Sequence, residues 1–223
     1  MRMPPQKRTR VRRGTLNRDL IVDAAIGVLD RDGVEGFTMR AVAAALGAQQ
    51  MSIYNYVTGK DDLLKAASMH LHTSVKPPPS DSSSIEDFIG VYRELWVLLK
   101  SHPWLVHVAV PPDSKEFLQL VEPTYRVLFR LGLSAREAAV FVTAVSNLVV
   151  GCAAHYAAMQ QSAAGEDERI AADHAAIAAL PEKEYPALQR LVEELPAVTP
   201  EAALEHGFAA LVSSLGLPRE RNP

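Results

Sequence analysis

Hydrophobic residues recur with helical spacing along most of the chain. In its first 75 residues, apolar positions three and four apart predict helices over 17–33 and 38–46, a short helix over 50–56, and a longer one from 60 to about 75. Asn17 and Thr38 are suitable N-cap residues, and Gly33 and Gly47 are suitable ends because glycine readily adopts a left-handed backbone. No run shows the alternation of a strand. We therefore predict an all-α protein.

The segment "KPPPSDSSS", residues 76–84, is the clearest boundary in the chain. Three successive prolines cannot continue a helix, so this segment is a linker or a sharp turn. Beyond it the spacing predicts helices over 85–100, 102–109, 115–131, 135–160 and 200–216, with one or two more between 166 and 194. The helix over 135–160 is apolar nearly all round, so it must be buried on most faces.

Charge is distributed unevenly between the two parts of the chain. Residues 1–65 hold 11 Lys and Arg against 7 Asp and Glu, a net charge of +4, whereas residues 66–223 carry −7. Seven of the basic side chains lie within residues 1–18, which contain no acid. This start of the chain is either a solubilising tail or an arm that neutralises DNA phosphates or reaches a minor groove.

Composition is that of an ordinary globular protein, with 48% hydrophobic and 22% charged residues among 223. The single cysteine, Cys152, excludes an internal disulfide framework and a cysteine-rich metal site, which favours a reducing compartment. The basic start has no apolar stretch behind it, and we find no run of roughly 18 uncharged apolar residues. We expect a cytoplasmic protein with no membrane segment.

Two short helices joined at Gly47, the second of which carries polar side chains, are typical of a helix-turn-helix. Amides of Gln and Asn can pair with adenine edges, hydroxyls of Ser and Tyr can reach bases or phosphates, and Met51 can meet a thymine methyl group. The alternative is that the aromatic and apolar residues of this helix pack in the core and that the polar ones only face solvent.

The stretch "LIVDAAIGVLDRDGVEGFTMRAVAAALGAQQMSIYNYVTGKDDLL" resembles the N-terminal DNA-binding domain of the TetR family of bacterial repressors. The opening "LNRDLIVDAA" is similar to the tetracycline-repressor branch. This resemblance implies a homodimer of all-helical subunits that binds a double-stranded DNA operator, with a larger C-terminal domain that binds a small-molecule inducer. The helices over 135–160 and 200–216 resemble the two that form the dimer interface in this family, and the alternative is that the helix over 135–160 is a core helix of a monomer. We therefore expect a basic flexible arm over 1–16, a helix-turn-helix domain over 17–65, and a ligand-binding and dimerisation domain over 66–218.

The resemblance also assigns DNA-binding roles to individual residues. Arg40 falls on a base-reaching position of the second helix, and Thr38 and Lys60 fall on phosphate-contacting positions. Both of the latter stand at helix N-termini, where free N–H groups favour phosphate. The recognition-helix positions are Gln49, Gln50, Met51, Ser52, Tyr54, Asn55 and Tyr56. Met51 replaces a proline common in the closest relatives, so their base preference does not transfer.

Candidate ligand-binding residues in the C-terminal half are Tyr92, Trp96, Trp104 and His107, which could line an aromatic pocket or pack in the core. By its place before "VAVPP", His107 matches a histidine that holds drug-bound magnesium in tetracycline repressors. The Asn and Phe that grip the drug there are replaced by Tyr92 and Trp96. We therefore expect a mostly apolar inducer other than tetracycline, with no metal and no cofactor.

Two other classes of function compete with a ligand-released repressor on a pseudo-palindromic operator. Cys152 and His155 could suggest a nucleophile and a base, but no third orienting group follows, and we expect no enzyme activity. The second alternative is a DNA-binding regulator that has no small ligand and is controlled by a protein partner.

Overall fold

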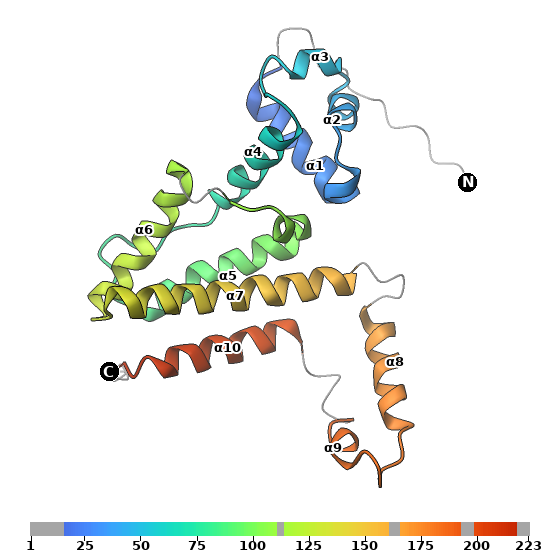
Figure 1. Ribbon diagram of the computed structural model, residues 1–223, viewed down its shortest axis with the longest axis vertical. Coiled ribbons are helices and arrows are strands. Elements are labelled where there is room, and N and C mark those ends of the chain that lie inside the picture. The colour runs from blue at the N-terminus through green and yellow to red at the C-terminus, as the bar shows by residue number, and fades with distance from the viewer. Residues whose placement is uncertain (1–15, 111–113, 161–165, 193–198, 218–223) are drawn as a thin grey trace. The chain divides into compact units, whose positions relative to one another are not determined.

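The computed structural model describes residues 16–110, 114–160, 166–192 and 199–217, and every regular element within them is helical (Figure 1). The prediction of an all-α fold is therefore confirmed. The first half contains α1 (Arg18–Gly36), α2 (Met39–Leu46), α3 (Gln50–Ile53), α4 (Lys60–His72), α5 (Ile85–Ser101) and the 3-10 helix η1 (Pro103–His107). The second half contains α6 (Lys115–Arg130), α7 (Ala135–Gln160), α8 (Glu166–Ala178), α9 (Pro186–Gln189) and α10 (Pro200–Ser214).

The predicted caps form in the structure. The side chain of Asn17 accepts a hydrogen bond from the Leu20 N–H at 2.8 Å, and Thr38 Oγ1 accepts one from the Ala41 N–H at 3.1 Å. Gly47 ends α2 with a φ of 61°. Gly33, with a φ of 67°, also leaves the helical conformation, but it forms a kink inside α1 because one more turn follows it.

Two elements are shorter than the sequence pattern indicates. The region predicted to be helical over 50–56 contains a single α-helical turn, Gln50–Ile53, because the backbone leaves the α-helix after Tyr54. The region predicted over 102–109 is the five-residue helix η1, which begins at Pro103. Each of these segments carries candidate functional side chains.

Contacts within the chain divide it into two compact units, one comprising residues 1–77 and 101–123 and the other residues 78–100 and 124–223. The core of the first unit forms where α1 packs on α2 and α4. Its fully buried side chains include Ile21, Phe37, Ile53 and Leu63. Ile53 is the buried residue of α3, so one side chain anchors this helix in the core.

In the second unit, α10 runs alongside α7 (Figure 1). Gly207 permits the close approach of the two helices, because a Cβ atom at this position would lie 2.6 Å from Leu148 Cδ2. Leu204 and Phe208 on α10 are buried. Aromatic rings add to this core, since the ring centroid of Phe88 on α5 lies 5.0 Å from that of Tyr92 and 5.4 Å from that of Phe141 on α7.

Helix α7 corrects one expectation. It is long and apolar enough to cross a membrane by length and composition, with a mean hydropathy of 1.7, and it is the only such helix among the described residues. The expectation that no run reaches that length is therefore wrong for α7. Core helices of soluble proteins pass the same test, and α7 packs with α10.

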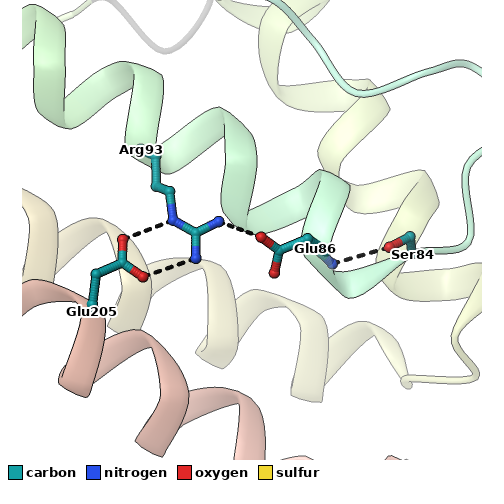
Figure 2. Close-up of polar contacts among 4 residues, drawn as sticks. All are labelled: Ser84, Glu86, Arg93 and Glu205. Carbon is teal, nitrogen blue, oxygen red and sulfur yellow. Dashed lines mark hydrogen bonds and ion pairs between the residues drawn. The ribbon is translucent and has the colours of Figure 1, made fainter. Parts of the chain in front are cut away.

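Ion pairs attach α10 to α5. Arg93 binds both carboxylate oxygens of Glu205 through Nε and Nη2, at 2.7 and 2.8 Å, and also pairs with Glu86 (Figure 2). One turn earlier on α10, Glu201 accepts a hydrogen bond from Lys100. Hydrogen bonds from these cations lower the pKa of the Glu205 and Glu201 carboxyls below their ordinary value of 4.5.

We expect acid to weaken this attachment. Because the folded-state pKa values of Glu201 and Glu205 are depressed, their contribution to stability is present above pH 4.5 and is lost as the pH falls through the lowered values. Exposed pairs of this kind contribute about 0.2–1 kcal/mol each. Thermal denaturation followed by circular dichroism between pH 7 and pH 3 should show a falling Tm. The variant E201Q/E205Q should have a lower Tm at pH 7 and a flatter pH profile, and identical profiles for both proteins would contradict this assignment.

Candidate DNA-binding surface and ligand site

The turn between α2 and α3 is built around Gly47. Its left-handed backbone lets the N–H groups of Gly47 and Ala48 bond to the carbonyls of Ala44 and Ala43, at 3.2 and 3.0 Å. The chain then reverses and enters α3 at Gln49, whose side chain makes no capping bond. Two helices joined by a short glycine turn have the geometry that the sequence predicts for a helix-turn-helix.

Helix α3 and the residues after it separate into a buried side and an exposed side. Ile53 and Val57 are buried, whereas Met51 is 75% exposed. Of the seven predicted recognition residues, Ser52 is half-buried and the others are exposed: Gln49, Gln50, Met51, Tyr54, Asn55 and Tyr56. The tyrosines therefore do not pack in the core, and Gln50 Nε2 lies 3.5 Å from the Tyr54 hydroxyl. Contacts of this exposed side with DNA remain a prediction.

The predicted phosphate contacts lie in the same unit. Thr38 is exposed and caps α2, so its hydroxyl proton is still available to a phosphate oxygen. Arg40 is exposed in the first turn of α2. Lys60, at the start of α4, extends over the Phe37 ring at 5.8 Å and has its Nζ atom 3.4 Å from the Val34 carbonyl oxygen.

Tyr92 and Trp96, the candidate ligand residues on α5, are buried in the second unit. The Tyr92 hydroxyl accepts a hydrogen bond from Ser146 Oγ on α7 at 3.4 Å, and burial raises the pKa of this phenol. Among the described residues, the indole N–H of Trp96 has no hydrogen-bond partner, although the side chain is only 5% exposed.

Around Trp96 the structure adds residues that the sequence reasoning missed. The ring of Tyr156 on α7 lies edge-on to Trp96, with centroids 6.0 Å apart. The Lys100 Nζ atom lies 5.7 Å from the Trp96 ring centroid and 5.0 Å from that of Tyr156. The i, i+4 spacing of Trp96 and Lys100 was a readable signal, whereas nothing in the sequence indicated Tyr156.

Trp104 and His107, the other candidate ligand residues, belong to η1 in the first unit. Trp104 is buried, and its indole N–H donates to Asp30 Oδ1 on α1 at 2.8 Å. His102 Nδ1 lies 2.7 Å from the same oxygen. His107 is exposed at the end of η1. The indole N–H of Trp104 therefore has its hydrogen-bond acceptor within the first unit. Nothing in the sequence indicated that this acceptor is Asp30.

The described residues bear on two further kinds of chemistry, metal ligation and nucleophilic attack by Cys152. Residues 16–110, 114–160, 166–192 and 199–217 contain no group of three His, Cys, Asp or Glu side chains that could hold a metal ion. Burial raises the pKa of the Cys152 thiol, which disfavours the nucleophilic thiolate.

Comparison with known protein families decides the relationship. Residues 21–67 match "Bacterial regulatory proteins, tetR family", and residues 76–215, more than half of the chain, match "Tetracyclin repressor-like, C-terminal domain". The chain belongs to the TetR family. The resemblance noted from the sequence is thereby confirmed, including its similarity to the tetracycline-repressor branch. The TetR family is a family of transcriptional regulators and not of enzymes, so the expectation of no enzyme activity also holds.

Individual proteins similar to this chain are also transcriptional regulators. An HTH-type transcriptional regulator from Saccharopolyspora erythraea is 35% identical over 150 residues, which cover 66% of this chain and 63% of that protein. The class D tetracycline repressor from Escherichia coli is 26% identical over 207 residues, 88% of each chain. The structure of the TetR family protein ActR from Streptomyces coelicolor in complex with (S)-DNPA superposes with a TM-score of 0.70, at 26% identity, over 89% of this chain and 98% of that one.

Proposed function

We propose that this TetR-family protein is a cytoplasmic repressor that binds a pseudo-palindromic DNA operator as a homodimer and is released by a small, mostly apolar ligand. The observation that carries the proposal is the exposed polar and aromatic side of α3, next to a buried Ile53, within the segment that matches the TetR DNA-binding family. Exposed Gln, Asn and Tyr side chains have the hydrogen-bonding groups that read base edges in the major groove.

A homodimer is supported by the surfaces of α7 and α10. Helix α7 exposes Val140, Thr143, Asn147, Val150 and Ala154, which lie on one side of the helix at spacings of three and four residues and are mostly small or apolar. Helix α10 exposes several alanines of its own, Ala202, Ala203, Ala209 and Ala210. Apolar side chains of this kind are buried favourably when the same surfaces of two subunits meet. Two recognition helices would then be held at a fixed spacing on the operator, one or more DNA turns of roughly 34–36 Å apart.

A small ligand is supported by the surroundings of Trp96. Trp96 is buried and its indole N–H can donate to a ligand oxygen, and the rings of Trp96 and Tyr156 offer aromatic surface beside the Lys100 ammonium group. This chemistry suits a planar aromatic molecule that carries a carbonyl or phenolic oxygen. The related ActR was solved in complex with the small molecule (S)-DNPA. A ligand that binds better to the non-operator conformation must, by linkage, weaken DNA binding.

The basic arm, the contact residues and the domain limits complete the proposal. We assign phosphate contacts to Thr38 and Lys60, base contacts to Arg40 and the exposed residues of α3, and ligand contacts to Tyr92, Trp96, Trp104 and His107. The arm over 1–16 lies almost wholly outside the described residues. The helix-turn-helix domain over 17–65 and the ligand-binding domain over 66–218 are proposed as functional limits, although the contacts of residues 101–123 group them with the first unit.

Selection from random DNA tests the proposal directly. The purified full-length protein should enrich duplexes with two inverted half-sites, and planar aromatic compounds that raise its Tm should release it from those duplexes. Failure to enrich any sequence would refute the DNA-binding function. Sequence-specific binding, combined with no shift in Tm across a broad compound library, would favour the alternative regulator that answers to a protein partner.

A further inference from the structure

The segment that follows the recognition helix is held by a residue of α1, outside the α2–turn–α3 motif itself. Helix α3 is only one turn long and has no side-chain N-cap, so its own hydrogen bonds fix its orientation weakly. At its far end, the Tyr56 carbonyl oxygen accepts a hydrogen bond from Nη1 of Arg18, the first residue of α1, at 2.8 Å. The contact joins residues 38 positions apart in the chain.

The second branch of the same guanidinium holds the segment that follows α3. Arg18 Nη2 binds Asp62 Oδ1 at 3.1 Å, and the other oxygen of Asp62 accepts the Thr58 N–H at 2.8 Å and the Thr58 hydroxyl at 3.3 Å. One planar side chain therefore connects the carbonyl at the end of the recognition segment to the carboxylate in the first turn of α4. A lysine could not serve both acceptors in this way, because its single ammonium group lacks the planar fork.

We propose that Arg18 and Asp62 form a clamp that positions the recognition helix, and that Arg18 acts through this clamp and not as a phosphate contact. The proposal rests on the DNA-binding function proposed above. Counted by charge alone, Arg18 would belong to the basic arm that precedes it. The structure assigns it instead to two internal acceptors on the segment that carries Tyr54, Asn55 and Tyr56.

A clamp residue and a phosphate contact at Arg18 predict opposite effects for one substitution. Asp62→Asn removes a negative charge near DNA and releases Arg18, so binding should become stronger if Arg18 is a phosphate contact. If the clamp positions α3, the same substitution should weaken binding to the operator despite the favourable change in charge. We expect Arg18→Ala and Asp62→Asn each to weaken operator binding about 10-fold and to reduce the preference for operator over scrambled DNA.

Arg31→Ala is the matched control. Arg31 lies on the same helix and carries the same charge. Among the residues that the structure describes it pairs only with its neighbour Asp32, and 61% of its side chain is exposed. Operator affinity should be measured for the full-length wild type and the three variants between 50 and 200 mM salt. For Arg18→Ala the slope of log K against log salt should match that of Arg31→Ala, whereas loss of a phosphate contact would reduce the slope by about 0.9.

Amide exchange supplies a readout that does not depend on DNA. Exchange at Thr58 should accelerate in Arg18→Ala and Asp62→Asn but not in Arg31→Ala, because the Thr58 N–H bonds to the Asp62 carboxylate. Tighter operator binding by Asp62→Asn, or unchanged affinity and exchange in both clamp variants, would overturn the clamp. Absence of any DNA sequence bound by the wild type would instead overturn the proposed function, so the two failures are distinguishable.

Discussion

Replacement of Gln50 or Tyr54 by alanine should sharply weaken operator binding while leaving the homodimer intact. Both side chains are exposed, and within the described part of the chain the one side-chain hydrogen bond of Gln50 is a 3.5 Å approach to the Tyr54 hydroxyl. Their loss should therefore not change Tm by more than a few degrees. A good pair of hydrogen bonds to a base discriminates by about 1–3 kcal/mol, which corresponds to a 5- to 150-fold loss of affinity for the selected operator.

Fluorescence anisotropy with labelled operator measures this loss, and sedimentation velocity measures the dimer. Gln119→Ala is the matched control, because it removes the same amide from an exposed position of α6 outside the helix-turn-helix. This control should bind the operator as the wild type does. Wild-type affinity in both Gln50→Ala and Tyr54→Ala would show that the exposed side of α3 does not contact the major groove.

Substitution of Trp96 should separate induction from DNA binding. Trp96→Ala is expected to keep operator binding and to lose release by the inducing compound, because the buried ring and its N–H donor disappear together. Deleting a buried aromatic side chain costs about 3–5 kcal/mol, so a milder variant is needed as well. Trp96→Phe keeps an aromatic ring and removes the indole N–H, and we expect it to fold and to respond more weakly than the wild type.

The same release assay, repeated with a chelator, checks the expectation that no metal assists the ligand. Release of the operator by the inducing compound should be equal in the presence and absence of a chelator. Loss of induction with the chelator, restored by added magnesium, would show that a metal assists the ligand and would contradict this expectation for His107. Full induction of Trp96→Ala would show that the ligand lies elsewhere and that Trp96 is a packing residue only.

Local signals made the helices of the N-terminal unit predictable. Asn17 and Thr38 cap through their own side chains, and Gly47 ends α2 through its left-handed backbone, so neighbouring residues determine these boundaries. The extent of α3 was overestimated because an apolar residue at Val57 continues the helical spacing after the backbone has left the helix. Periodicity reports which side chains are buried, and it does not report whether the backbone between them is helical.

Long-range partners were not predictable in the same way. Asp30 and Trp104 are separated by 74 positions, and Arg18 and Tyr56 by 38, so no local pattern connects them. A side chain that donates to a distant carbonyl also looks, in sequence, like any other basic residue. This is why Arg18 was counted with the arm and why Trp104 was considered only as a wall of a pocket.

The single turn of α3 separates a buried anchoring residue from exposed residues, and this separation bears on how such regulators diverge in evolution. Ile53 secures the turn in the core, whereas Met51, three-quarters exposed, and its polar neighbours contribute little to that core. Gene duplicates could therefore exchange the outward residues one at a time and acquire new operators without passing through an unfolded intermediate. The stability of the turn and the choice of operator would then depend on different residues, so a substitution that changes the operator need not lower the stability of the domain.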